Sequence, residues 1–318
     1  MSTPLLRVSG LKKHFPSGRR GATPVKAVDD VSFDIEEGQT MGLVGESGCG
    51  KSTTGRSVLR LIEPTAGKIE FMGQELTTLG AAPLRAMRRN MQMVFQDPFA
   101  SLNPRMTIGQ VLEEPLIVHR LADRTSRKRK VAETLEVVGL NAGYADRYPH
   151  EFSGGQRQRV GIARAIITRP KLVVADEAVS ALDVSIQAQI LNLLQDLQKE
   201  LGLTYLFVSH DLAVIRHVSD RIGVMYLGRM VESGSCENVY RSPKHPYTQA
   251  LLSAIPREHP DQVRERIVLQ GSIPNPAAPP SGCHFHPRCP SCMDLCKTQA
   301  PPAIAVSAGE YVTCHLYR

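Results

Sequence analysis

Apolar residues recur in short runs along the first part of the chain, separated by residues that favour turns. Such runs occupy 5–8, 31–35 and 41–44, and we predict a strand at each of them. After Gly50 the apolar positions take on helical spacing, which predicts a helix to about Leu61.

The middle of the chain alternates between the same two patterns. A strand is predicted at 91–96, followed by a stretch with helical character from 108 to 138. Continuous apolar runs at 172–175 and 204–209 are typical of strands buried on both faces. Between them a helix is predicted, which ends at Gly202 and has its apolar positions at Ile186, Ile190, Leu193, Leu194 and Leu197. Strands that alternate with helices indicate a mostly parallel α/β core.

The composition fits a soluble globular protein. A content of 42% hydrophobic and 22% charged residues excludes a disordered or fibrous chain. Aromatic residues are scarce and tryptophan is absent, which argues against a module that stacks nucleic-acid bases. The net charge of +7 is compatible with nucleic acid, an anionic membrane or nucleotide phosphates. The basic residues are spread out, except for clusters at 85–89 and 124–130 that we interpret as solvated helix faces, so we expect no nucleic-acid partner.

The chain contains no apolar run of the roughly 18–20 residues that a membrane-spanning helix needs. Its start also lacks the pattern of a secretory signal. We therefore expect a cytoplasmic protein that reaches a membrane only through partners. From about Ser242 the chain is rich in proline, with PNPAAPPSG at 274–282, and we expect 241–318 to be an extension of a main domain at 1–240.

A glycine-rich loop fits the phosphate-binding pattern G-x-x-x-x-G-K-[ST] and stands between a predicted strand and a predicted helix. It consists of Gly45, Glu46, Ser47, Gly48, Cys49, Gly50, Lys51 and Ser52. The glycines let backbone N–H groups point at phosphate oxygens, and the helix N-terminus adds a partial positive charge. Lys51 is placed to reach the β- and γ-phosphates and Ser52 to bind Mg²⁺. The alternative, a chance glycine-rich turn, does not explain the flanking strand and helix.

Two carboxylates, Asp176 and Glu177, end the buried strand at 172–175. The C-terminal edge of such a strand is where an open α/β sheet presents its ligands. Asp176 can hold the Mg²⁺ shell through water, and Glu177 can polarise the attacking water as a general base. Acidic residues often end strands, so this pair gains its meaning from the phosphate-binding loop.

A second glycine-bearing helix start follows a hydroxyl residue at 153–156, in the sequence Ser-Gly-Gly-Gln. It can form another site for a phosphate. One nucleotide does not need two such loops from one chain, so we infer a dimer in which each loop serves the nucleotide of the opposite subunit. The alternative is a capped helix with a Gly-Gly hinge.

Together with Ser209-His210-Asp211, these motifs resemble the ATP-binding-cassette (ABC) ATPases over residues 5–240. The resemblance implies ATP and Mg²⁺ as cofactors and ATP hydrolysis as the reaction. It also implies an α/β fold with a P-loop NTPase (RecA-like) core and an antiparallel β subdomain. A helical subdomain would be inserted at roughly 99–165, and the C-terminal extension would be rich in cysteine.

The same resemblance implies roles for single residues. Gln96 matches the Q-loop glutamine that contacts Mg²⁺ and the attacking water, and His210 matches the switch histidine that contacts the γ-phosphate. Phe15 resembles the aromatic residue that stacks on adenine. The remaining residues implied to bind nucleotide are Thr53, the D-loop aspartate Asp183 and the signature residues Ser153, Gly154, Gly155 and Gln156. Ala178 departs from the family, which usually has proline after the catalytic glutamate.

Three longer stretches, at 94–105, 147–153 and 245–252, resemble the bacterial importers of peptides and nickel. The likeness is greatest to the second ATP-binding subunit of dipeptide and oligopeptide permeases. It implies a heterodimer with a paralogous ATPase, two transmembrane permease subunits and an extracytoplasmic solute-binding protein. The chain would then lie at the cytoplasmic face of the inner membrane. Glutathione and nickel systems carry similar ATPases, so the solute stays open.

The tail holds five of the seven cysteines. Four of them, Cys283, Cys289, Cys296 and Cys314, could hold zinc or a [4Fe–4S] cluster, and spacing alone does not choose between the two. The tail resembles the extension of peptide-importer ATPases, which implies the [4Fe–4S] cluster on these four residues. Cys292 is additional to that pattern. Free buried thiols are the remaining alternative.

Two rival functions fit the motifs less well. Soluble cassette ATPases that act on ribosomes or DNA usually carry two cassettes or a long coiled-coil insertion, and neither is visible in this sequence. A scaffold that binds nucleotide without hydrolysis would not need Lys51, Asp176, Glu177 and His210 together.

Overall fold

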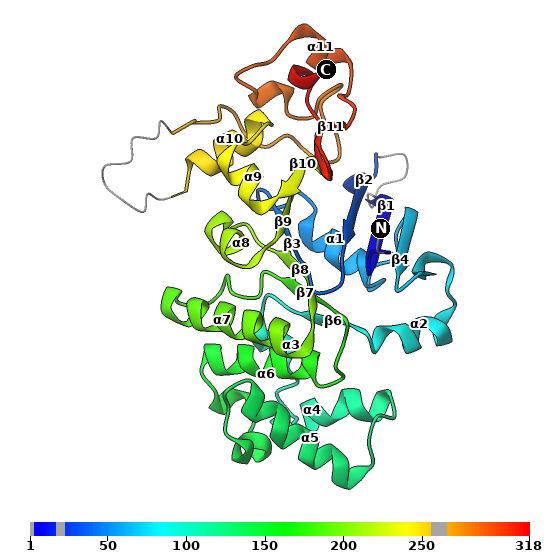
Figure 1. The fold of residues 1–318 in the computed structure, drawn as a ribbon, viewed down its shortest axis with the longest axis vertical. Coiled ribbons are helices and arrows are strands. Elements are labelled where there is room, and N and C mark those ends of the chain that lie inside the picture. The colour runs from blue at the N-terminus through cyan, green and yellow to red at the C-terminus, as the bar shows by residue number, and fades with distance from the viewer. Residues whose placement is uncertain (1–2, 17–22, 256–265) are drawn as a thin grey trace. The chain divides into compact units, whose positions relative to one another are not determined.

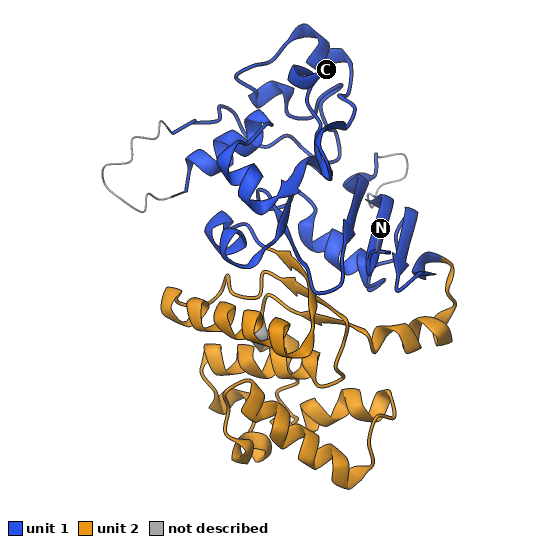
Figure 2. Cartoon of the chain, in the orientation of Figure 1, with its two compact units in different colours: residues 1–77, 209–318 blue, residues 78–208 orange. Residues whose placement is uncertain are grey.

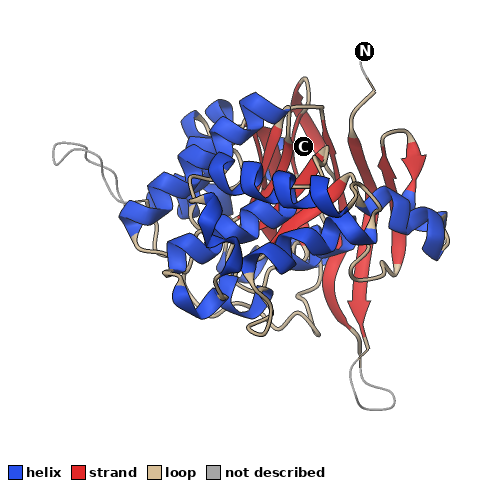
Figure 3. Ribbon diagram, turned by 90° about the horizontal axis from the view of Figure 1, so that it is seen from below, coloured by secondary structure: helices blue, strands red, loops and turns tan. Residues whose placement is uncertain are grey.

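The structure, a computed structural model, describes residues 3–16, 23–255 and 266–318. The chain divides into two units, residues 1–77 with 209–318 (unit 1) and residues 78–208 (unit 2), as Figure 2 shows. Strands and helices are mixed in both units, so the protein is α/β as predicted (Figures 1 and 3).

The N-terminal part of unit 1 forms an antiparallel sheet with the strand order β2-β1-β4-β5. Its strands are β1 (Leu6–Phe15), β2 (Val25–Ile35), β4 (Ala66–Phe71) and β5 (Gln74–Glu75). Burial alternates at the start of β1, where Leu6 and Val8 are buried and Arg7 is exposed, so only one face packs against the core. Leu6 pairs with both Ile35 and Phe71, which sets the register of the three longer strands.

The other strands of unit 1 follow the order β11-β12-β10-β9-β3. They are β3 (Thr40–Val44), β9 (Arg221–Tyr226), β10 (Arg229–Ser235), β11 (Ile304–Ser307) and β12 (Glu310–Val312). β3 and β9 run parallel, whereas the pairs beyond β9 are antiparallel. Every residue of β3 is buried, as a strand covered on both faces requires. A Cβ on Gly42 would lie 2.6 Å from Cγ2 of Ile215, so glycine lets α8 (Leu212–Val218) approach this strand closely.

The remaining helices of unit 1 are short. They are α1 (Lys51–Val58), α9 (Cys236–Arg241), α10 (Pro246–Ser253), α11 (Asp294–Thr298) and the 3₁₀ turns η1 (Leu76–Thr78), η4 (His286–Arg288) and η5 (His315–Tyr317). α1 begins directly after Gly50, as predicted, and ends at Val58, before the predicted Leu61.

Unit 2 contains three parallel strands in the order β8-β7-β6. They are β6 (Met91–Val94), β7 (Leu172–Asp176) and β8 (Thr204–Val208), and all residues of β7 and β8 are buried. The helices are α2 (Ala81–Arg88), α3 (Pro98–Ser101), α4 (Ile108–Val118), α5 (Arg124–Val137), η2 (Ala142–Asp146), η3 (Pro149–Glu151), α6 (Gly154–Ile166) and α7 (Val184–Leu201). The predicted strands are thus confirmed, although β6 ends two residues early.

Helix ends in unit 2 follow local sequence signals. α7 ends at Gly202, which has a left-handed φ of 63° and confirms the predicted helix end. The stretch predicted as helical from 108 to 138 is two helices, because Arg120 adopts a φ of 53° and Asp123 then caps α5 by accepting from the Ser126 N–H at 2.8 Å.

Two further predictions concern the organisation of the chain. The domain boundary at residue 240 and the helical subdomain at 99–165 stay predictions, although α3 to α6 fall within or next to the latter range. Across residues 3–16, 23–255 and 266–318, none of the helices combines the length and the apolar character that crossing a membrane requires.

Candidate nucleotide-binding site

The glycine-rich loop joins β3 to α1 within unit 1, and two of its glycines are required by the backbone. Gly45 has a φ of 151°, and a Cβ there would lie 2.2 Å from the carbonyl oxygen of Met225. Gly50 has a φ of 106°, and its Cβ would lie 2.0 Å from the carbonyl oxygen of Ala27. Any side chain at these positions would collide with neighbouring backbone, so the loop owes its shape to glycine.

Lys51 lies beneath the loop and is buried. Its Nζ donates hydrogen bonds to the carbonyl oxygens of Gly45 at 2.8 Å and Glu46 at 3.0 Å. Among the described residues no side chain caps the first N–H groups of α1, whose N-terminus therefore carries its partial positive charge unopposed. The loop is therefore suited to bind phosphates, because it combines an ammonium group, uncapped backbone N–H groups and the flexibility of glycine.

The other expected nucleotide ligands of unit 1 lie on three elements. Ser52 and Thr53 are partly exposed in the first turn of α1. Phe15 ends β1 with 36% of its surface exposed, and the Nζ of Lys13 lies 5.0 Å from its ring centre. An exposed ring can stack on a base, whereas a core position could not. His210 is exposed one residue after Ser209, whose N–H donates to the carbonyl oxygen of Leu43 at the end of β3.

The carboxylates expected to hold the Mg²⁺ shell and to activate the attacking water lie at the end of β7 in unit 2. Asp176 is completely buried. Glu177 has a φ of 48°, a left-handed conformation that is uncommon for a residue other than glycine, and its N–H donates to the carbonyl oxygen of Val208. Nε2 of Gln96 donates to Oε2 of Glu177 at 3.0 Å. The structure thus brings together two of the three residues expected to be catalytic.

Ser153 and Gln156 form a reciprocal capping box at the start of α6. The Gln156 N–H donates to Oγ of Ser153 at 3.3 Å, and the Ser153 N–H donates to Oε1 of Gln156 at 3.0 Å. A Cβ on Gly155 would lie 2.6 Å from Cγ2 of Ile186, so this glycine allows α6 and α7 to pack closely. The capped-helix interpretation therefore describes the local geometry, and the binding of a nucleotide in trans stays a prediction. Asp183 is exposed at the N-cap of α7.

Two arginines of α6 contact α3. The guanidinium of Arg157 lies 3.7 Å from the centre of the Phe99 ring and donates through Nε to the carbonyl oxygen of Pro149. About two helical turns further along α6, Nη1 of Arg164 donates to the carbonyl oxygen of Ser101 at 2.5 Å. The helix that follows the signature residues is therefore attached at two points to the short helix that follows Gln96.

The cysteine tail does not assemble the expected ligand set. The pKa values of the Cys283 and Cys289 thiols are raised to about 11, mainly by burial and to a smaller extent by neighbouring thiols that include Cys314. The Cys283 N–H donates to the carbonyl oxygen of Cys296, and Cys314 lies near enough to Cys283 and Cys289 to affect both thiols, so the four cysteines lie in one region. Within the part of the chain that the structure describes, no three His, Cys, Asp or Glu side chains are arranged to hold a metal ion.

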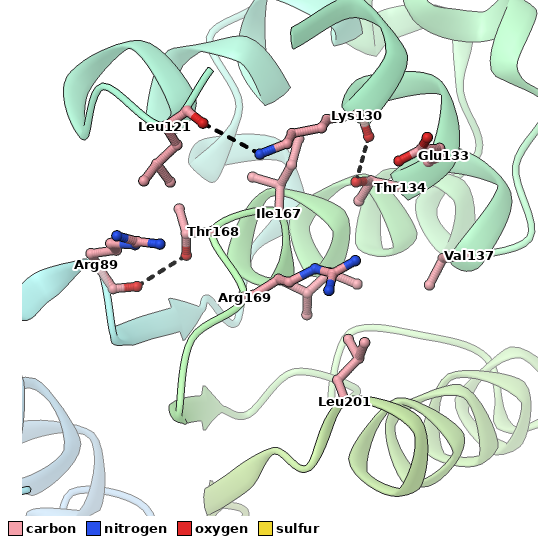
Figure 4. A pocket seen from close by; sticks show the side chains of 11 residues that line it. Arg89, Leu121, Lys130, Glu133, Thr134, Val137, Ile167, Thr168, Arg169 and Leu201 are labelled. Atoms are coloured by element: carbon pink, nitrogen blue, oxygen red, sulfur yellow. Dashed lines mark hydrogen bonds between the residues drawn. The ribbon is translucent and has the colours of Figure 1, made fainter. Parts of the chain in front are cut away.

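A pocket of about 330 Å³ lies in unit 2 apart from all of these motifs (Figure 4). Its lining includes the basic residues Arg89, Lys130 and Arg169. Lys130 donates through Nζ to the carbonyl oxygen of Leu121, and Thr168 donates through Oγ1 to that of Arg89. None of its lining residues belongs to the nucleotide motifs, so the pocket has no part in the site.

Two residues that contact the glycine-rich loop were not predicted from the sequence. Tyr247 accepts a hydrogen bond from the N–H of Glu46, and Arg288 forms an ion pair with the Glu46 carboxylate. Tyr247 belongs to the stretch 245–252 that resembles peptide importers, but its contact with the loop had no signal in the sequence. Arg288 lies between Cys283 and Cys289, in a segment whose only recognisable sequence pattern is that of its cysteines.

Comparison with known proteins identifies the two parts of the chain separately. Residues 28–180 match the ABC transporter family, and residues 231–296 match the C-terminal region of oligopeptide and dipeptide transporters. Among solved structures, the chain is similar to the ATP-binding cassette MJ0796 bound to ADP and phosphate in its dimeric, post-hydrolysis state. The sequences are 30% identical, and the match has a TM-score of 0.66 and covers 73% of this chain and 98% of that one.

Curated relatives match the chain from end to end. The oligopeptide transport ATP-binding protein AppF of Bacillus subtilis is 55% identical over 320 residues, covering 98% of this chain and 97% of the relative. A putative peptide import ATP-binding protein of Brucella ovis is 56% identical over 312 residues, covering 98% of both. These matches confirm the predicted family. The chain belongs to the ATP-binding-cassette transporter family, as an ATPase that carries the C-terminal region of the oligopeptide and dipeptide transporters.

Proposed function

We propose that this protein is the ATP-hydrolysing subunit of a bacterial importer of dipeptides or oligopeptides. The observation that carries the proposal is the end-to-end match, over 98% of the chain, to proteins named for oligopeptide transport and peptide import. The match includes the C-terminal region, which a cassette alone does not have.

Within unit 1, Lys51 would exchange its bonds to loop carbonyls for the β- and γ-phosphates of ATP. The loop residues Gly45 to Ser52 and Thr53 would surround the phosphates, Phe15 would stack on adenine and His210 would contact the γ-phosphate. The exposure of Phe15 and His210 supports these roles, because both side chains are accessible to a ligand.

Within unit 2, Glu177 would act as the general base towards water. Its hydrogen bond from Gln96 supports this role, because the bond fixes the orientation of the carboxylate. Gln96 and Asp176 in this unit offer oxygen atoms of the kind that Mg²⁺ prefers, and so, in unit 1, does Ser52. Bound Mg²⁺ would neutralise charge that develops on the transferring phosphate.

Ser153, Gly154, Gly155, Gln156 and Asp183 would serve the nucleotide of a second, paralogous ATPase. We therefore propose a heterodimer that works with two transmembrane permease subunits and an extracytoplasmic solute-binding protein. The protein would lie on the cytoplasmic face of the inner membrane, held there by the permease.

Co-purification and uptake test this function together. The tagged chain, extracted from its own membranes with mild detergent, should retain two permease subunits and a second cassette ATPase. Cells whose chain carries Lys51→Ala should lose uptake of labelled dipeptide, while Lys199→Ala, an exposed change on α7, should leave uptake intact. Recovery of ribosomal RNA or DNA with the chain, or loss of nickel uptake alone, would contradict the assignment to peptides.

We also propose a [4Fe–4S] cluster on Cys283, Cys289, Cys296 and Cys314, with zinc as the alternative. The position of the four cysteines in one region supports it, because a bound metal ion would stabilise thiolates at residues whose thiols burial otherwise keeps protonated. The tail would have to close around the metal, since the described side chains are not arranged as ligands.

Anaerobic purification followed by iron, sulfide and zinc analysis decides between these options. A cluster gives about equal iron and sulfide and a broad visible absorbance, which Cys283→Ser removes and Cys292→Ser keeps. Zinc without iron favours the alternative. A preparation without either metal shows that the thiols are free.

A further inference from the structure

Glu46, the second residue of the glycine-rich loop, is held at all three of its polar groups. Arg288 binds its carboxylate with two hydrogen bonds, Nη1 to Oε2 at 2.8 Å and Nη2 to Oε1 at 3.1 Å. The Glu46 N–H donates to the hydroxyl oxygen of Tyr247 at 2.9 Å, and its carbonyl oxygen accepts from Nζ of Lys51 at 3.0 Å. Two of these partners belong to the C-terminal extension.

The ion pair between Arg288 and Glu46 has the features of a strong ion pair. The Arg288 side chain is only 8% exposed and the Glu46 side chain 25%, so water screens the pair weakly. Its fork geometry, with two parallel N–H···O bonds, fixes direction as well as distance. The hydrogen bonds to Glu46 raise the pKa of Arg288 above its already high value, so the guanidinium stays charged.

An aromatic cluster anchors the two residues that hold Glu46. The rings of Tyr226, Tyr247 and Phe285 are almost completely buried, with centroid separations of 4.8 Å, 5.2 Å and 5.4 Å. Tyr226 comes from β9, whereas the other two come from the extension. Because Phe285 directly precedes η4, which ends with Arg288, the cluster fixes the guanidinium relative to the loop.

We propose that Arg288, together with Tyr247, is a positioning residue for nucleotide binding. The extension holds Glu46, Glu46 holds its carbonyl oxygen under Lys51, and the loop is thereby kept in one shape before phosphates arrive. A loop that is already ordered loses less conformational freedom on binding. Affinity for ATP therefore depends on a residue 242 positions away in sequence. This inference rests on the proposed role of the loop as the nucleotide site.

Nucleotide titration of the full-length chain tests the inference. Arg288→Gln should weaken ATP binding at least about fivefold, the lower end of typical coupling between sites, and leave turnover at saturating ATP near normal. Arg288→Lys, which keeps the charge but not the fork, should recover part of the affinity. The control is Lys297→Gln, which removes a positive charge from the same extension at an exposed pair with Asp294 and should change nothing.

Glu46→Gln distinguishes positioning from simple attraction of charges. If Arg288 and Glu46 acted on ATP only through their charges, removing the negative carboxylate would strengthen binding. Positioning predicts the opposite, a loss similar to that of Arg288→Gln. The double variant E46Q/R288Q keeps the summed charge of the pair at zero, and it should be no weaker than either single variant because both remove the same contact.

Lys51→Ala separates a failure of this inference from a failure of the site. If Lys51→Ala binds ATP normally, the loop is not the nucleotide site and the proposed function falls with it. If Lys51→Ala loses ATP while Arg288→Gln binds it with unchanged affinity, only the inference on Arg288 is overturned. A lower melting temperature with unchanged ATP affinity in the folded fraction would also overturn it, because the contact would then serve stability alone.

Discussion

Gln96 and Glu177 are 81 residues apart in sequence, yet Nε2 of the amide lies 3.0 Å from Oε2 of the carboxylate. Each follows a neighbouring parallel strand, β6 or β7, and their meeting is a consequence of that pairing. A carboxylate held by a neutral donor keeps its second oxygen oriented. This arrangement suits a base that must meet one water molecule in one direction.

Replacing Glu177 by glutamine should therefore stop hydrolysis without preventing ATP binding. The amide cannot accept a proton, and loss of a general base typically slows the reaction by about 10²–10⁴-fold. Phosphate release measures the turnover, and filter-retained ATP measures the trapped nucleotide. Glu200→Gln, an exposed change on α7, is the matched control. Hydrolysis at a normal rate in Glu177→Gln would remove this residue from the role.

Gly50→Ala should abolish nucleotide binding by distorting the loop. Its Cβ would lie 2.0 Å from the carbonyl oxygen of Ala27, and backbone cannot yield as a flexible side chain can. We expect a loss of about 3 kcal/mol in the free energy of unfolding, at the upper end of overpacking costs. Chemical denaturation and ATP titration measure the two effects.

Gly73→Ala is the control for that substitution. Gly73 also has a positive φ, 75°, but nothing lies within 4 Å of an added Cβ. Only the conformational cost of roughly 1–2 kcal/mol should appear, with ATP affinity unchanged. Equal losses in the two variants would show that steric contact at Gly50 is unimportant.

Two glycines of α6 should respond to alanine in opposite directions. Gly155→Ala places a methyl group 2.6 Å from Cγ2 of Ile186, and we expect a destabilisation of about 1–3 kcal/mol. Gly161→Ala meets nothing within 4 Å and should stabilise the helix by up to about 1 kcal/mol. Thermal unfolding of both variants checks the prediction. Ile186→Ala added to Gly155→Ala should restore stability if the methyl contact is the cause.

Stability should fall on acidification because of His245. Burial lowers the pKa of this imidazole to about 3, and its Nδ1 accepts the N–H of Tyr247 at the start of α10. The unfolded chain binds a proton near pH 6.5, whereas the folded chain does not. The contribution of neutral His245 to the free energy of unfolding is therefore fully present above pH 6.5. It declines as the pH falls towards 3, by at most about 1.4 kcal/mol per pH unit.

Asparagine at position 245 isolates this effect. Its side-chain oxygen can replace Nδ1 as the acceptor for the Tyr247 N–H, but it does not titrate. His245→Asn should thus flatten the dependence of stability on pH between 6.5 and 5. His217→Asn, at an exposed position of α8, should keep the wild-type slope. The same slope in both variants would assign the acid sensitivity to other groups.

The sequence predicted the elements whose patterns are local. Strands β7 and β8 are buried on both faces and read as continuous apolar runs, and Gly202 marks the end of α7 through its left-handed φ. The break between α4 and α5 was missed because Arg120 adopts a positive φ that its residue type does not announce. The local pattern of apolar residues thus located most elements. One predicted helix is divided into two by the backbone conformation of a single residue, Arg120.

Contacts between distant segments could not be predicted in the same way. The pairing of Gln96 with Glu177 follows from strand order, which the chain alone does not reveal. The contact between Glu46 and Arg288 joins a motif to a segment whose cysteines were the more visible feature. Sequence motifs identify the residues that carry the chemistry. The residues that hold those motifs in place become visible only once the folded structure shows which distant segments pack together.

The double attachment of α6 to α3 has a mechanical consequence. Arg157 on the Phe99 ring and Arg164 on the Ser101 carbonyl leave little freedom for one helix to slide past the other. A movement of α3 would therefore also move α6 and the signature residues at its start, because the two contacts prevent α3 from shifting alone. The two helices would move as one rigid body.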